Sequence, residues 1–275
     1  MDIKSLTDTP GKLPTIPKVT QKLIESFGSA DVSVGEIAAL ITADPALSAK
    51  LLWLANSAYF HVSNTIGTVD DALRMLGFVM VRNMVLGNGL AFAFRNTPGM
   101  DLKQFWRYNL YTACASRWLA THLGTNSDMA FTLGLMHGIG QLQLHAVAPA
   151  AMTPLDQQLN VLDAKRHEIE TTALGFHYGD VSAALAGVWN FPTPLVNALG
   201  NIPDPLSAAE FSTPAGCVHI AAWLARTEVL ASNDKEIEAS YPSAVGLRLG
   251  LPPVWAPALM PPLKDLTQGL EDLLA

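Results

Sequence analysis

Apolar side chains recur along most of the chain at spacings of three and four residues, which is the period of an α-helix that buries one face. The clearest stripe near the N-terminus consists of Val34, Ile37, Ala38 and Ile41. No run alternates β-branched and polar residues for long enough to indicate a β-strand. The pattern therefore predicts an all-α protein.

Residues that favour helix ends flank several of these stripes. Thr68 is placed to cap a helix that Gly77 would end, and Asp101 is placed to cap a long helix further on. Ser33 and Glu36 stand at the spacing of a capping box, in which each side chain accepts a hydrogen bond from a free backbone N–H. These residues predict where helices begin and end.

His137 is the histidine of greatest interest. A single helix is expected from Ser127 to His145, and it would place His137 mid-helix on the apolar face. A buried imidazole needs a partner for each ring nitrogen, so His137 is either a hydrogen-bonded core residue or a ligand. The core residue is the favoured interpretation. No two of the seven histidines stand four residues apart, the spacing that would put two imidazoles on one helix face for a shared metal ion.

Other unusual residues also have structural interpretations. The run from Gly175 to Asp180 carries a histidine and a tyrosine, but a helix entrance with Asp180 as its cap is favoured over a site. A helix is also expected to begin at Thr153-Pro154. The six tryptophans lie within apolar stripes, where core packing is favoured over a cofactor pocket or a stacking platform for nucleic acid.

Composition narrows the class of protein. The chain has 275 residues, of which 49% are hydrophobic and 15% charged, so it can bury a large core and is not intrinsically disordered. Its net charge of −7 would repel a phosphate backbone, and direct nucleic-acid binding is not expected. No stretch reaches the roughly 18 consecutive apolar residues of a membrane-spanning helix, so membrane insertion is not expected either.

The N-terminus, the cysteines and the absence of common motifs add further expectations. Residues 1–17 lack the apolar core of a signal peptide, which favours a cytoplasmic location. Cys114 and Cys217 lie in apolar, helix-like segments, without the spacing of a zinc site or a disulfide framework. Phosphate-cradling glycine loops, dinucleotide fingerprints and nucleophile elbows do not occur in the sequence.

Several motifs together resemble one known family. Residues 13–17 read Leu-Pro-Thr-Ile-Pro, and residues 43–60 run from Ala-Asp-Pro-Ala-Leu-Ser to Asn-Ser-Ala-Tyr-Phe. Shorter matches follow at 66–86, 105–107, 134–137, 174–176 and 189–192. In this combination the chain resembles the HDOD family, the HD-related output domain of bacterial signalling proteins, over residues 12–205.

The resemblance implies a fold and a division of the chain. The expected fold is a multi-helix bundle like that of HD-domain phosphodiesterases, with an N-terminal helical subdomain. Residues 12–95 would form that subdomain, and residues 101–205 a degenerate HD core. Residues 206–275 would form a C-terminal helical extension packed on the same body, ending in a short amphipathic segment at 263–274.

The resemblance also shows which metal ligands of the HD phosphohydrolases are missing. The first histidine of the superfamily falls at Tyr108, beside Asn109. Its histidine–aspartate pair becomes His137-Gly138, and a later histidine falls at Tyr178. The paired histidines that follow a Trp-x-x-Pro turn fall near Ile202-Pro203. His137 is thus the one remnant of the HD motif, and one imidazole cannot hold a hydrolytic metal ion.

These replacements lead to a functional expectation. No catalytic residue, metal or cofactor is expected, and the chain is interpreted as a non-enzymatic adaptor whose partners are other signalling proteins. The binding surface cannot be assigned, because exposed and buried apolar stripes look alike in a sequence. The alternative is that the remnant pocket binds a nucleotide second messenger without cleaving it. Phosphates require cationic donors, and Arg107 is the only one that the sequence indicates near the former site.

Overall fold

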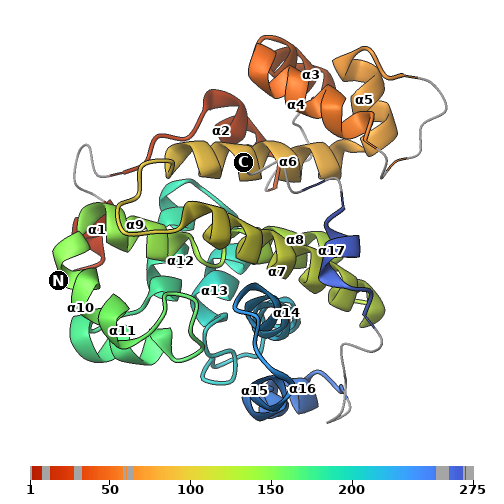
Figure 1. The fold of residues 1–275 in the computed structure, drawn as a ribbon. Coiled ribbons are helices and arrows are strands. Elements are labelled where there is room, and N and C mark those ends of the chain that lie inside the picture. Colours follow the sequence, from red (N-terminus) through yellow and green to blue (C-terminus); the bar gives the residue numbers. More distant parts are fainter. Residues whose placement is uncertain are drawn as a thin grey trace.

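The all-α prediction is confirmed in the structure, a computed structural model (Figure 1). It describes residues 2–7, 13–27, 33–57, 60, 65–251, 260–268 and 270. Seventeen α-helices lie within these residues, and no β-strand occurs among them. The helices form an N-terminal group, a central bundle and a C-terminal group.

The N-terminal group lies along one side of the central bundle (Figure 1). Its helices are α1 (Lys4–Thr7), α2 (Lys18–Glu25), α3 (Val34–Thr42), α4 (Pro45–Ala55), α5 (Val69–Leu76) and α6 (Phe78–Ala93). The helices α2 to α6 bury their apolar faces in one cluster, which also takes in Leu110 and Phe131 of the central bundle. The short helix α1 instead contacts α9 and α12. Apolar burial thus joins the first third of the chain to the bundle.

The central bundle is organised around one long helix. Its helices are α7 (Leu102–His122), α8 (Ser127–Met136), α9 (Ile139–Val147), α10 (Pro149–Gln158), α11 (Arg166–Leu174), α12 (Tyr178–Val188) and α13 (Thr193–Asn201). The helix α7 packs along α8, and α12 packs against α9 and α13. This arrangement brings the ends of several helices together on one side of α7.

The C-terminal group packs on the same bundle. Its helices are α14 (Thr213–Val229), α15 (Asp234–Ser240), α16 (Ser243–Arg248) and α17 (Leu263–Leu266). The helix α14 lies against α7 and α8, and its apolar residues belong to the main core. Beyond α17, Leu270 is 3% exposed and joins the N-terminal cluster. Of the predicted segment 263–274, residues 269 and 271–274 lie outside the described residues.

No single helix among the described residues is both long and apolar enough to cross a membrane. The two longest are α7, with 21 residues, and α14, with 17. Two sharply bent pairs, α3 with α4 and α5 with α6, meet the length and composition criteria only when their two arms are counted together.

The predicted helix ends are confirmed in part. Thr68 accepts a hydrogen bond from Asp71 N, Gly77 ends that helix with φ 79°, and Asp101 caps α7. Ser33 is the N-cap of α3, but its side chain makes no capping hydrogen bond. Caps depend on residues close in sequence, so most of them can be predicted locally.

Two predicted helix boundaries are wrong. The expected single helix 127–145 is two helices that break at His137-Gly138, because a glycine weakens a helix interior and here allows close packing on α7. The helix expected to open at Thr153-Pro154 begins one turn earlier, at Pro149, and Pro154 lies inside it. His137 therefore lies at a helix junction.

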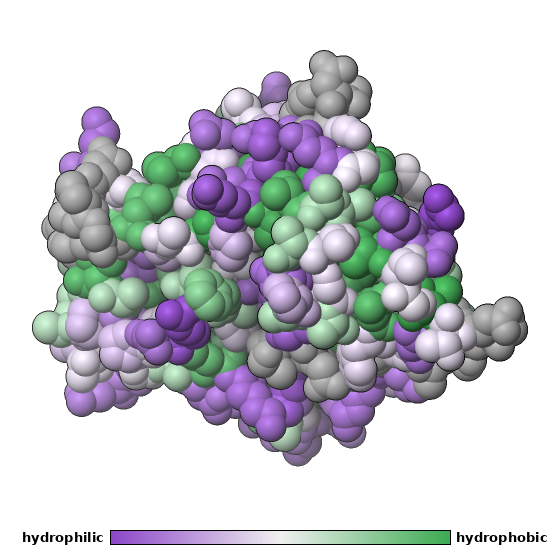
Figure 2. Space-filling view, turned by 90° about the horizontal axis from the view of Figure 1, so that it is seen from above, coloured by the Kyte–Doolittle hydropathy of each residue, from purple (hydrophilic) through white to green (hydrophobic). Residues whose placement is uncertain are grey.

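The tryptophans are mostly core residues. Trp106, Trp189 and Trp223 are buried, whereas Trp53 on α4 is 46% exposed, against the prediction of core packing. Trp255 lies outside the described residues. Val34 and Phe92, also on N-terminal helices, are exposed as well. Figure 2 shows one face of the molecule, where apolar patches alternate with hydrophilic side chains.

Gly140 allows α9 to approach α12 closely. A Cβ atom at this position would lie 2.0 Å from the Tyr178 carbonyl oxygen and 2.9 Å from Ser182 N, so backbone would have to move. We expect Gly140→Ala to lower the free energy of unfolding by about 1–3 kcal/mol, measured by urea denaturation. Gly187→Ala on α12 is the matched control, because a Cβ there meets nothing within 4 Å and should raise stability slightly. Equal effects of both substitutions would contradict this packing.

Candidate functional site

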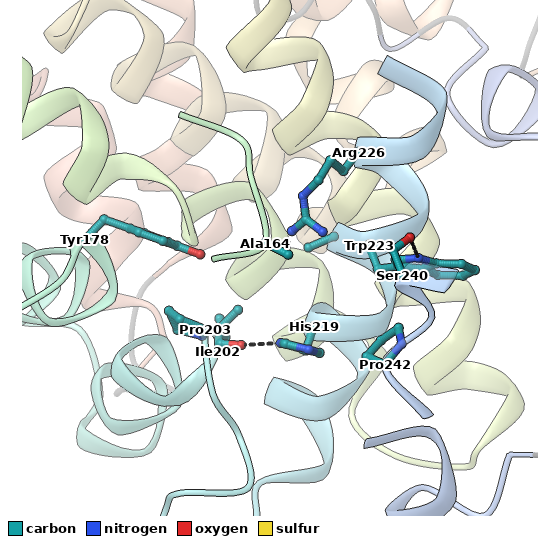
Figure 3. A pocket seen from close by; sticks show the side chains of 10 residues that line it. Ala164, Tyr178, Ile202, Pro203, His219, Trp223, Arg226, Ser240 and Pro242 are labelled. Atoms are coloured by element: carbon teal, nitrogen blue, oxygen red, sulfur yellow. Dashed lines mark hydrogen bonds between the residues drawn. The ribbon is translucent and has the colours of Figure 1, made fainter. Parts of the chain in front are cut away.

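The positions that the family resemblance assigns to metal ligands of HD phosphohydrolases come from several helices of the folded chain. Tyr108 comes from α7, His137 from the α8–α9 junction, Tyr178 from the start of α12 and Ile202-Pro203 from the end of α13. The rings of Tyr108 and His137 are 5.1 Å apart between centroids, edge to face. Tyr178, Ile202 and Pro203 line one recess (Figure 3).

His137 is held as a neutral imidazole. Its side chain is buried, and Nδ1 donates a hydrogen bond to the carbonyl oxygen of Gly134 at 2.7 Å. Burial lowers the pKa of His137 to about 4 because the charged form loses hydration, and the positive charge of Arg226 acts in the same direction. Nε2 is buried and has no hydrogen-bond partner among the described residues. One ring nitrogen thus fits the predicted core histidine, and the other does not.

Gly138 is closely packed against α7. A Cβ atom built on Gly138 would lie 3.0 Å from Cζ of Phe105 and 3.1 Å from Oδ1 of Asn109. A carboxylate would extend further, so the Phe105 ring and the Asn109 amide would both have to move. Phe105 and Asn109 themselves are buried and fixed by the packing of α7. A side chain at position 138 would therefore need Phe105 and Asn109 to shift.

The two tyrosines present neutral phenols in place of imidazoles. Burial raises the pKa of Tyr108 and of Tyr178 above the ordinary value, because the phenolate would lose hydration. The positive charge of Arg226, and then its hydrogen bond with the phenol, oppose this rise of the pKa at Tyr108. Among the described residues, no group of three or more His, Cys, Asp or Glu side chains is arranged to hold a metal ion.

Two further residues of the site come from α14 and were not predicted. Arg226 donates a hydrogen bond from Nε to the carbonyl oxygen of Leu162, and His219 donates from Nδ1 to that of Ile202 at 2.8 Å. Burial lowers the pKa of His219, so its imidazole is neutral. By contrast, Arg107 is exposed on α7 and does not line the recess, so its assignment to the former site is wrong.

A signal for these two residues was present in the sequence. His219 and Arg226 are seven residues apart, which places them on one face of an otherwise apolar helix. A lone histidine and a lone arginine on such a face indicate a polar site. Both residues lie C-terminal to residues 12–205, the range of the family resemblance, so the motifs did not indicate them.

The recess itself is small. It has a volume of about 50 Å³, which is room for roughly three to five water molecules. Its lining combines apolar residues with three polar side chains that come from α12 and α14, namely Tyr178, His219 and Arg226. Trp223 closes another part of the wall and donates from Nε1 to Ser240 Oγ at 3.0 Å (Figure 3).

A buried charged network supports one wall of the site. The side chains of Arg166 and Glu170 are fully buried and form an ion pair at 2.8 Å. Glu170 also accepts hydrogen bonds from the Gln141 amide and from Tyr178 N at 2.8 Å. Asp156 accepts from Arg166 at 2.7 Å. The network links α9, α10, α11 and α12, and it fixes the backbone at the residue that lines the recess.

The run 175–180 is a helix entrance, as favoured from the sequence. Gly175 ends α11 in the left-handed region at φ 84°, and His177 is the N-cap of α12. Asp180 stands at the third helical position and completes a capping box, so it supports the cap rather than being the cap itself.

Comparison with known proteins decides the family. The HDOD domain matches residues 13–205 of this chain. The chain belongs to the HDOD family. A curated relative from Treponema pallidum, described as an uncharacterized protein, is 25% identical over 197 residues, which is 71% of this chain. The chain spans about 38% of the length of that relative.

Solved structures confirm the fold of this HDOD protein. A Shewanella amazonensis protein, provisionally assigned as a phosphohydrolase, is 28% identical, with a TM-score of 0.77 and 98% of each chain covered. An HDOD domain protein of unknown function from Geobacter sulfurreducens is 20% identical, with a TM-score of 0.70 over 90% of this chain and 87% of that one. A Marinobacter aquaeolei protein is 22% identical, with a TM-score of 0.71 over 96% of this chain and 58% of that one.

Proposed function

We propose that this HDOD protein is a non-enzymatic regulatory module of bacterial signal transduction that acts by binding other proteins. Membership of a family of output domains supports the signalling role. The Marinobacter aquaeolei protein of the same fold carries the description of a signal transduction protein. The chemistry of the remnant HD site supports the non-enzymatic part, and the exposed surface supports the binding of proteins.

The observation that carries the proposal is the close packing of Phe105 and Asn109 on Gly138. Hydrolysis of a phosphodiester by a metal site needs several protein donors and one open position for water. Phe105 and Asn109 crowd Gly138, the residue predicted at the aspartate position, and Tyr108, predicted at a histidine position, is a buried phenol. His137 remains as a single neutral donor. Such a set has too few ligands and no negative charge.

Arg226 strengthens this conclusion. Its guanidinium interacts with the Tyr108 phenol and disfavours positive charge at His137. The same repulsion acts on a divalent cation at that place. The Shewanella amazonensis protein is assigned as a phosphohydrolase, and the filled site is our reason for not extending that activity to this chain.

Metal content, turnover and partner capture test the proposal. We expect purified protein to hold less than stoichiometric iron or manganese and to show no hydrolysis of bis(p-nitrophenyl) phosphate above background when Mn²⁺ or Fe²⁺ is added. Affinity capture from the native bacterium should recover a reproducible protein partner. Trp53→Ser, which removes an exposed aromatic ring, should weaken capture, whereas Leu247→Ser at another exposed apolar position should not. Metal-dependent turnover, or no partner in repeated captures, would contradict the proposal.

The alternative function is the binding of a nucleotide second messenger, and the size of the recess restricts how much of such a ligand could enter it. A volume of about 50 Å³ does not enclose a base and a ribose, because ligand pockets for such molecules measure roughly 300–1,000 Å³. A nucleotide second messenger would therefore have to leave most of its surface outside. The recess accommodates one small polar group.

A further inference from the structure

We propose that the recess between Tyr178 and α14 is a receptor for one anion of phosphate size, either free phosphate or the phosphate of a monoester, bound by Arg226. The helix α14, which lies outside the residues matched by the HDOD domain, supplies this arginine. The inference goes beyond the proposed adaptor role and does not depend on it.

The charge of the recess points to an anion. Arg226 is the one formally charged side chain that lines it, and no described carboxylate forms an ion pair with Arg226. A partly buried charge without a counter-ion is costly unless a ligand compensates it. Asp204 and Glu170 influence neighbouring histidines, but neither lines the recess, and Glu170 is paired with Arg166. The electrostatic potential inside is therefore set by Arg226.

The hydrogen-bonding groups also match a phosphate. A guanidinium has five N–H donors in a planar fork suited to phosphate oxygens. The Arg226 group commits Nε to Leu162 and contacts Tyr108, and its remaining donors reach the recess between Tyr178 and His219 (Figure 3). His219 donates Nδ1–H to Ile202, which leaves Nε2 as an acceptor for a protonated phosphate oxygen or a hydroxyl.

The volume of the recess limits the size of the ligand that it can hold. Room for roughly three to five water molecules is comparable with the four oxygens of one phosphate group. The recess is open to solvent at one side, so the rest of an ester can stay outside. Hydrogen bonds fix its walls: Trp223 Nε1 donates to Ser240 Oγ, and the backbone N–H of Tyr178 donates to the Glu170 carboxylate. A preformed site loses little freedom on binding.

Titration with inorganic phosphate tests the inference. At constant ionic strength set with chloride, phosphate should raise the melting temperature of the wild-type protein saturably, because a ligand of the folded state stabilises it. Arg226→Gln should raise the Kd for phosphate at least tenfold. Arg107→Gln, the same change of charge at an exposed position, should alter the Kd less than twofold.

A second readout uses the wild-type protein alone, so it stands if Arg226→Gln does not fold. Phosphate should shift the indole N–H resonance of Trp223, which lines the recess, and leave that of the exposed Trp53 unchanged. A lower Kd for adenosine monophosphate than for phosphate would identify a nucleotide ester as the ligand, and equal values would identify the free anion or a simple ester. Both results support the site. An absence of saturable binding, or binding without a shift of Trp223, would overturn the inference, while hydrolysis and partner capture are measured separately.

Discussion

Replacing Arg166 by methionine should destabilise the protein by about 3–5 kcal/mol, which is the cost of breaking a buried ion pair by removal of one partner. The side chains of Arg166 and Glu170 are both 0% exposed, and the pair lies at 2.8 Å. In Arg166→Met the Glu170 carboxylate would stay buried without a cation. Urea denaturation at neutral pH measures the effect as a lower midpoint at an unchanged m-value.

The control for Arg166→Met is the same substitution at an exposed ion pair. Arg74 pairs with Asp71 at 3.5 Å, but its side chain is 81% exposed, so Arg74→Met should cost less than about 1 kcal/mol. The double variant Arg166→Met/Glu170→Gln should be more stable than Arg166→Met, since it removes the unpaired charge and its amide oxygen still accepts from the Tyr178 N–H. Equal losses at Arg166 and Arg74 would show that the buried network contributes nothing.

Acid should destabilise the folded chain through His137. The pKa of His137 is about 4 in the folded chain, against 6.5 for an ordinary histidine, so between these values the unfolded state binds the extra proton. Stability from this group is complete above pH 6.5 and is lost as pH falls to 4. The difference corresponds to about 3 kcal/mol. Urea denaturation at several pH values between 4 and 7.5 gives the slope.

Substitution of His137 separates its contribution to the pH dependence of the unfolding free energy from the contributions of other titratable groups. His137→Gln should flatten the dependence of unfolding free energy on pH, although His219 and His177, whose pKa values burial also lowers, keep part of it. His122→Gln is the control for the substitution itself, because His122 is exposed at the end of α7. An identical slope in wild type and His137→Gln would show that His137 is not buried as a neutral imidazole.

Under the proposed function, the chain keeps the fold of its relatives and uses the site for binding. Phe105 and Asn109 pack closely on Gly138, and Arg226 brings a positive charge to the Tyr108 phenol. A fixed guanidinium attracts anions without activating water, because it is neither a Lewis acid nor a ligand for hydroxide. We therefore propose binding, and not hydrolysis, as the role of the recess.

Features that depend on residues close in sequence were predicted more accurately than features that depend on contacts between helices. The cap of α5 at Thr68 and that of α7 at Asp101 depend on atoms within three residues, and both were predicted. The break at His137-Gly138 depends on the Phe105 ring of α7, which is remote in sequence, and the prediction of one helix was wrong. The i,i+4 spacing of Arg166 and Glu170 can be read directly, but their complete burial cannot.

The sequence by itself determined that the chain is helical and that it resembles the HDOD proteins, because periodicity and motifs are properties of residue order. The assignment of Tyr108, Gly138 and Tyr178 to metal-ligand positions stays a prediction. Only the tertiary structure decided which side chains meet around these residues. The Phe105 ring reaches Gly138 from α7, and Arg226 reaches Tyr108 from α14, more than a hundred residues away in the chain. Such contacts arise from the packing of apolar helix faces, which sets the position of every polar side chain those helices carry.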